Sequence, residues 1–148
     1  MNLLNVSFGI FAFMPLGWLF MAFIIAIECF LMSKILAKQW RNKRVCNSVI
    51  FSNIISGIIG IIISLVITGG WWLVVWFPWV GRKEADPNLW FVIYYIVAFV
   101  LSVIIETITN ILFLKKEYKK SEIIRATLIV NIVTYLLGSV ILYSYSFN

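Results

Sequence analysis

The sequence predicts an all-α integral membrane protein with four transmembrane helices, arranged as two duplicated hairpins. Its composition is the first observation: 63% of the 148 residues are hydrophobic and 12% are charged. Soluble domains have about 45–50% apolar and about 25% charged residues. The mean hydropathy of +1.02 agrees with this contrast. A chain of this length is expected to form one domain, residues 1–148, which is too small to bury so much apolar surface away from water.

Four apolar segments are each long enough to cross a bilayer, which takes ~20 residues. The predicted spans are residues 15–35, 48–68, 90–114 and 126–145. Ten of the twelve basic residues fall in two short clusters, "KILAKQWRNKR" and "KKEYKKSEIIR", which follow the first and third spans. Such basic loops favour the cytoplasmic side, so both termini are predicted to lie outside. We expect these loops to contact anionic lipid headgroups rather than nucleic acid.

The connection between the second and third predicted spans is rich in tryptophan. Gly69, Gly70 and Pro78 favour breaks in helical structure there. The tryptophans of this segment are Trp71, Trp72, Trp76 and Trp79. Tryptophan side chains concentrate at membrane interfaces, so we expect the segment to lie flat in the outer interface. A lid or a docking surface is the alternative.

An internal correspondence relates the two halves of the chain. A shift of 78 positions, without a gap, superposes Glu28 on Glu106, Asn53 on Asn131, Ser56 on Thr134 and Gly60 on Gly138. Glutamate and asparagine are rare in membrane spans, so their coincidence predicts a duplicated hairpin, with repeats at residues 15–68 and 90–145. The alternative is a chance alignment of isoleucine-rich segments. Copies with the same orientation are related by a pseudo-two-fold axis along the membrane normal.

The corresponding polar residues predict a network inside the membrane. At ~1.5 Å per residue, the glutamates and their asparagines lie roughly 9–14 Å from the basic ends of their helices. The network is expected to contain Glu28, Asn53, Ser56, Glu106, Asn110, Asn131 and Thr134. No basic residue lies at the same depth to neutralise the acids. If the two carboxyl groups approach one another, they can share a proton.

Two functional interpretations remain open. In the first, the protein is a small transporter or channel-like protein whose acids bind protons or cations, because intramembrane acids usually mark functional sites. In the second, it is a non-catalytic membrane subunit or scaffold, in which the polar groups only pack helices and the loops bind a partner. A homo-oligomer or a membrane-protein partner fits both interpretations.

Enzymatic chemistry is a weaker hypothesis. The chain has no histidine and no phosphate-binding glycine-rich loop. Cys29 falls in a predicted span and Cys46 in a predicted loop, a placement that supports neither a disulfide nor a metal site. We therefore expect no metal and no cofactor. An enzymatic mechanism would use the two glutamates as acid and base.

Overall fold

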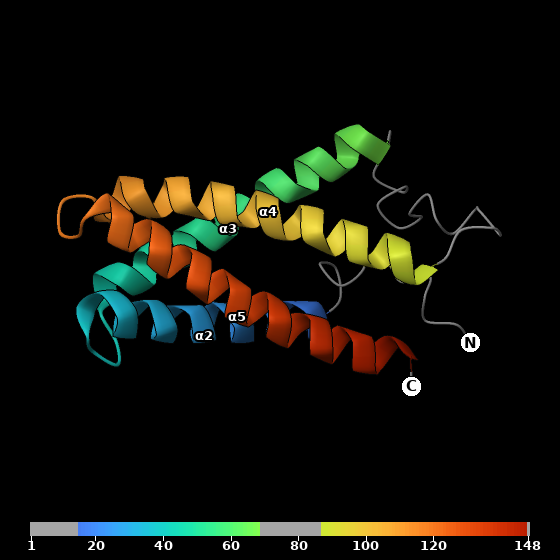
Figure 1. The fold of residues 1–148 in the computed structure, drawn as a ribbon, viewed down its shortest axis with the longest axis horizontal. Helices are drawn as coiled ribbons and strands as arrows, with labels where there is room; N and C mark the ends of the chain where they lie inside the picture. Colours follow the sequence, from blue (N-terminus) through green and yellow to red (C-terminus); the bar gives the residue numbers. More distant parts are fainter. Residues whose placement is uncertain (1–14, 69–86, 148) are drawn as a thin grey trace.

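The computed structural model describes residues 15–68 and 87–147, which form four long helices joined in pairs (Figure 1). The helices are α2 (Pro15–Ala37), α3 (Lys43–Thr68), α4 (Pro87–Leu114) and α5 (Lys120–Phe147). The main contacts run from α2 to α3, α3 to α4, α4 to α5 and α5 back to α2. The four helices therefore enclose a common interior, and the predicted all-α fold is confirmed.

Three of the described helices are long and apolar enough to cross a membrane. The candidate spans are Leu19–Ala37, Tyr95–Leu114 and Lys120–Ile141. The predicted span at residues 48–68 lies within α3 and is not among these three. Large apolar side chains are exposed on all four helices, including Leu19 on α2, Ile62 on α3, Leu112 on α4 and Leu136 on α5. An outer surface of this kind is compatible with lipid contact, as expected for an integral membrane protein.

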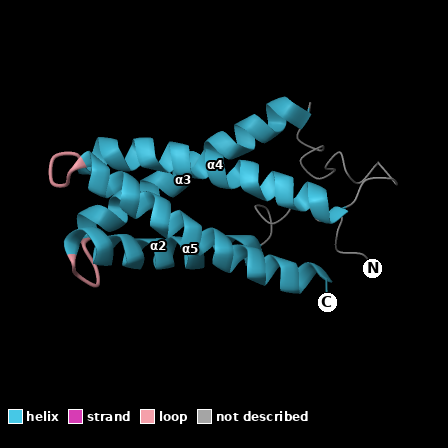
Figure 2. Cartoon of the chain, in the orientation of Figure 1, coloured by secondary structure: helices cyan, strands magenta, loops and turns pink. Residues whose placement is uncertain are grey.

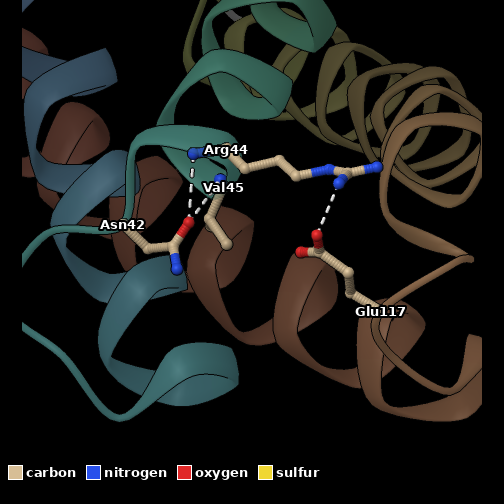
Figure 3. Close-up of polar contacts among 4 residues, drawn as sticks. All are labelled: Asn42, Arg44, Val45 and Glu117. Atoms are coloured by element: carbon tan, nitrogen blue, oxygen red, sulfur yellow. Dashed lines mark hydrogen bonds and ion pairs between the residues drawn. The ribbon is translucent and has the colours of Figure 1, made fainter.

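Both short turns lie at the same end of the bundle (Figure 2). The α2–α3 turn follows Lys38, whose φ of 53° places it in the left-handed region that often terminates helices. Asn42 then caps α3, because its Oδ1 accepts the backbone N–H groups of Arg44 at 3.0 Å and Val45 at 3.2 Å (Figure 3). The capped helix begins at Lys43, so Cys46 lies in the first turns of α3. The prediction that Cys46 lies in a loop is therefore wrong.

An ion pair joins the first turn of α3 to the α4–α5 turn. The guanidinium group of Arg44 donates to the carboxylate of Glu117, which lies between α4 and α5 (Figure 3). The two side chains are 51% and 39% exposed. Exposed pairs of this kind contribute about 0.2–1 kcal/mol, so this contact helps to align the hairpins without dominating their association.

The apolar core lies near the turns, and the buried positions farther along the bundle are polar. The core consists of Met32, Val45, Val49, Leu114, Ile123, Ala126 and Val130. Beyond it, the buried side chains include Glu28, Glu106, Asn131 and Thr134. The predicted interfacial residues Trp71, Trp72, Trp76 and Trp79 lie outside the described residues, and their location stays a prediction.

Candidate functional site

Two glutamates project into the interior from α2 and α4. Glu28 is 3% exposed and Glu106 is 4% exposed, although glutamate is rarely buried without a charged partner. Glu28 lies nine residues from either end of the candidate span Leu19–Ala37, and Glu106 lies eight residues before the end of Tyr95–Leu114. Both carboxyl groups therefore lie near the middle of apolar helices, where water is least available to solvate them.

Each glutamate accepts a hydrogen bond from an asparagine of the same hairpin. Asn53 Nδ2 donates to Glu28 Oε2 at 2.6 Å, and Asn131 Nδ2 donates to Glu106 Oε2 at 2.8 Å. Each amide gives its other N–H to the carbonyl four residues earlier, at 3.0 Å for Val49 and 3.1 Å for Thr127. The two acceptors around each amide nitrogen fix the orientation of the amide.

Each glutamate also accepts a hydrogen bond from the other hairpin. Thr134 Oγ1 on α5 donates to Glu28 Oε1 at 2.8 Å, and Ser56 Oγ on α3 donates to Glu106 Oε1 at 3.3 Å. We call the six residues Glu28, Asn53, Ser56, Glu106, Asn131 and Thr134 the polar layer. The shift of 78 (28 + 78 = 106, 53 + 78 = 131, 56 + 78 = 134) carries its four bonds onto one another.

The polar layer contains two acidic groups without a cationic partner. Every hydrogen-bond donor that the described part of the chain offers to Glu28 and Glu106 is a neutral amide or hydroxyl group. The one ion pair among the described residues is the distant Arg44–Glu117 pair. Burying an ionised carboxylate without compensation is costly in protein and in lipid alike. The arrangement is therefore chemically suited to take up a proton or a cation.

One atom of the polar layer lacks a hydrogen-bond partner. Asn131 Oδ1 is buried and accepts no hydrogen bond from the described residues, whereas both N–H groups of the same amide donate. Buried polar atoms in folded proteins are nearly always paired, so an unpaired acceptor beside a carboxyl group calls for an explanation.

Asn110 belongs to a second polar cluster, closer to the turns. Its Oδ1 accepts from Ser48 Oγ at 2.7 Å, and its Nδ2 donates to Thr127 Oγ1 at 3.2 Å. These bonds connect α4 to both α3 and α5 and include neither carboxyl group. The shift of 78 relates Asn110 to the apolar Met32, so this cluster has no counterpart in the corresponding positions.

Two tyrosines that were not predicted from the sequence extend the polar interior away from the turns. Tyr135 Oη lies 2.7 Å from Ser102 Oγ, and Tyr95 Oη donates to the carbonyl of Tyr135 at 2.8 Å. The available signal was helical spacing, since Ser102 lies four residues before Glu106 and Tyr135 lies four residues after Asn131. Ser102 therefore continues the polar face of α4 by one turn, and Tyr135 continues the polar face of α5 by one turn.

The contact between the two cysteines was also missed. The thiol of Cys29 lies 3.7 Å from the carbonyl oxygen of Cys46, and the thiol of Cys46 lies 3.9 Å from the carbonyl oxygen of Cys29. Both thiols are free. The contact packs α2 against α3 on the side of the polar layer that faces the turns.

Comparison of the chain with family models, with curated proteins and with solved structures finds no match. The geometry of the polar layer is therefore the basis for a functional proposal.

Proposed function

We propose that the protein is a small proton- or cation-linked transporter or channel-like protein, in which Glu28 and Glu106 bind the translocated or coupling ion. The observation that carries this proposal is the burial of both carboxyl groups among neutral donors near the middle of apolar helices. Two ionised glutamates would bring a charge of −2 into the interior. A bound proton or cation offsets that charge, and Asn53, Asn131, Ser56 and Thr134 position the acids to receive it.

The proposed architecture includes α3 as a fourth span and a duplicated hairpin. Helix α3 has 26 residues, about 39 Å at ~1.5 Å per residue, and the hydrocarbon core is ~30 Å thick. Its charged residues, Lys43 and Arg44, are at its first turn, and Ile54, Ile58 and Ile62 are exposed along its length. The four matching bonds of the polar layer support the duplication. The basic turns then face the cytoplasm, by the positive-inside tendency.

A second candidate function is that of a membrane subunit or scaffold. The observation in its favour is that each carboxyl oxygen accepts a hydrogen bond, so the polar layer links all four helices. A network of this kind can serve to orient helices alone. In that case the turns or the outer surface bind a partner protein, and no ion crosses the membrane through this chain.

Ion flux in liposomes tests the first function against the second. We expect liposomes that contain the purified protein to dissipate an imposed pH gradient or monovalent-cation gradient faster than empty liposomes. The double substitution Glu28→Gln, Glu106→Gln should reduce the flux to that of empty liposomes, because an amide cannot ionise. Glu122→Gln, an exposed acid in the first turn of α5, is the matched control and should leave the flux unchanged.

Two results would count against the first function. Flux that survives in the double glutamine protein would show that the acids do not carry the ion. If liposomes that contain the wild-type protein pass neither protons nor monovalent cations, the scaffold function is favoured, particularly if the protein copurifies with another membrane protein.

A further inference from the structure

We propose that Glu106, and not Glu28, holds the exchangeable proton, and that Asn131 Oδ1 accepts a hydrogen bond from the protonated carboxyl group. Glu106 Oε1 accepts from Ser56 when the group is ionised. On protonation, Oε1 carries an O–H that donates to Asn131 Oδ1 and completes a two-bond pair between a carboxylic acid and an amide. The inference rests on the proposed function and names the bound species as a proton. It also assigns different roles to two glutamates that the sequence relates to one another.

The unpaired oxygen of Asn131 is the first observation. Asn131 is 1% exposed, and its Oδ1 has no partner among the described residues. Its nitrogen lies within hydrogen-bonding distance of two acceptors, Glu106 Oε2 and the carbonyl of Thr127. The unpaired atom is therefore the oxygen, because rotating the amide by 180° would place an acceptor against two acceptors. A buried acceptor in this position requires a donor close to Glu106.

A protonated carboxyl group can supply that donor. An ionised carboxylate only accepts hydrogen bonds, whereas a protonated one also has an O–H donor. Glu106 already accepts the N–H of Asn131 through Oε2. When Oε1 takes a proton from water, its O–H can donate to Oδ1, antiparallel to the existing N–H···O bond. The same amide then serves as donor and acceptor to the same carboxyl group.

Ser56 can release Glu106 without losing its own hydrogen bond. Its bond to Glu106 Oε1 is 3.3 Å, the longest of the four in the polar layer. Ser56 Oγ also lies 3.1 Å from the backbone carbonyl of Asn53, which is ready to accept its proton. The exchange therefore leaves no donor stranded, and it replaces a bond between the hairpins with one inside the α4–α5 hairpin.

The Glu28 half of the polar layer differs in two respects, although Thr134, like Ser56, has an alternative backbone acceptor, the carbonyl of Val130 at 3.1 Å. Asn53 is only partly buried, and among the described residues the unsatisfied buried atom belongs to Asn131 alone. Thr134 holds Glu28 Oε1 at 2.8 Å, a shorter bond than that of Ser56 to Glu106. Glu28 is therefore held as an acceptor by both of its partners.

The titratable groups that face Glu106 are Glu28 from α2 and Tyr135 from α5. Helix α3 presents the neutral Ser56, and the described residues place no Lys or Arg against the carboxyl group. The two glutamates therefore titrate as an interacting pair, and the assignment of the proton to one of them has to be measured site by site.

Infrared difference spectroscopy between alkaline and acidic pH, on protein in lipid bilayers, measures this assignment. The probe is the C=O stretching band of a protonated carboxylic acid. We expect the band in wild type and in Glu28→Gln, and its loss in Glu106→Gln. Asn131→Ala should move the band to higher frequency, because the acid loses its hydrogen-bond partner. The matched control Asn53→Ala should leave the band in place, and so should Ser56→Ala.

Each contrary result overturns the inference in a different way. A band that disappears in Glu28→Gln places the proton on Glu28 and leaves the proposed function standing; this variant is decisive even if Glu106→Gln does not fold. A band that Asn131→Ala does not move, or that Asn53→Ala moves equally, removes the role of Asn131. If no variant shows a band, the polar layer binds no proton, and the flux of monovalent cations then decides the proposed function separately.

Discussion

Replacing Glu28 by alanine is expected to destabilise the bundle far more than replacing it by glutamine. Alanine deletes the acceptor for Asn53 and for Thr134. Thr134 has an alternative, since its Oγ1 lies 3.1 Å from the carbonyl of Val130. Asn53 has no alternative acceptor for the N–H that faces Glu28, because the carbonyl of Val49 is already the acceptor for its other N–H. A donor left without an acceptor costs up to about 1–3 kcal/mol, the value for a buried group, and the cavity left by the side chain adds to this cost.

Glutamine can be accommodated by a rearrangement of hydrogen bonds. Its amide oxygen accepts from Asn53, and its NH₂ group donates to Thr134 Oγ1, whose own proton turns to Val130. Bonds are exchanged and not deleted, so the protein should stay within about 1 kcal/mol of wild type. Thermal unfolding of the purified wild type, Glu28→Gln and Glu28→Ala proteins in detergent checks this order of stabilities. Equal losses in both variants would show that the ionised carboxylate itself holds the helices together.

Enlarging Gly138 is expected to disrupt the bundle, whereas the same change at Gly60 should not. A Cβ atom at Gly138 would lie 2.9 Å from Tyr95 Oη and 3.6 Å from Phe20 Cζ. Tyr95 cannot move away freely, because its hydroxyl donates to the carbonyl of Tyr135 at 2.8 Å. A Gly138→Val substitution therefore overpacks the contact of α5 with α4 and α2, which typically costs about 1–3 kcal/mol.

Gly60 is the matched control for this substitution, because the shift of 78 relates it to Gly138 (60 + 78 = 138). Nothing lies within 4 Å of a Cβ atom added there, and the residue is exposed. Gly60→Val should therefore leave the melting temperature close to that of wild type. Similar losses at the two positions would contradict the packing difference between the hairpins.

The sequence predicted the fold class and the correspondence of polar residues, but not the pairing across hairpins. Composition and apolar run lengths were enough for an all-α membrane protein. The spacing of 25 residues between Glu28 and Asn53, repeated in the second half, suggested which asparagine would meet which glutamate. Helical periodicity places Ser56 and Thr134 on a face but does not say which helix that face contacts. Their bonds to the opposite hairpin therefore required the structure.

Other differences have equally local causes. Asn110 shares a face with Glu106 but lies four residues nearer the turn, about 6 Å at ~1.5 Å per residue. At that level Ser48 and Thr127 form its hydrogen bonds. Gly60 and Gly138 correspond in sequence, yet only Gly138 is packed against neighbouring side chains. Positions that correspond in sequence can thus differ in packing, because contacts depend on the partner helix as well as on the residue.

The pH dependence of stability tests the central claim most directly. If the folded polar layer holds a proton that the unfolded chain releases, the native state binds more protons, and its stability falls as pH rises. We expect the melting temperature of wild type to fall from mildly acidic to mildly alkaline pH relative to that of the Glu28→Gln, Glu106→Gln protein, in which this contribution is absent. Parallel curves for the two proteins would contradict a proton held by these acids. A double mutant that is strongly destabilised at every pH would show that the carboxylates serve packing alone.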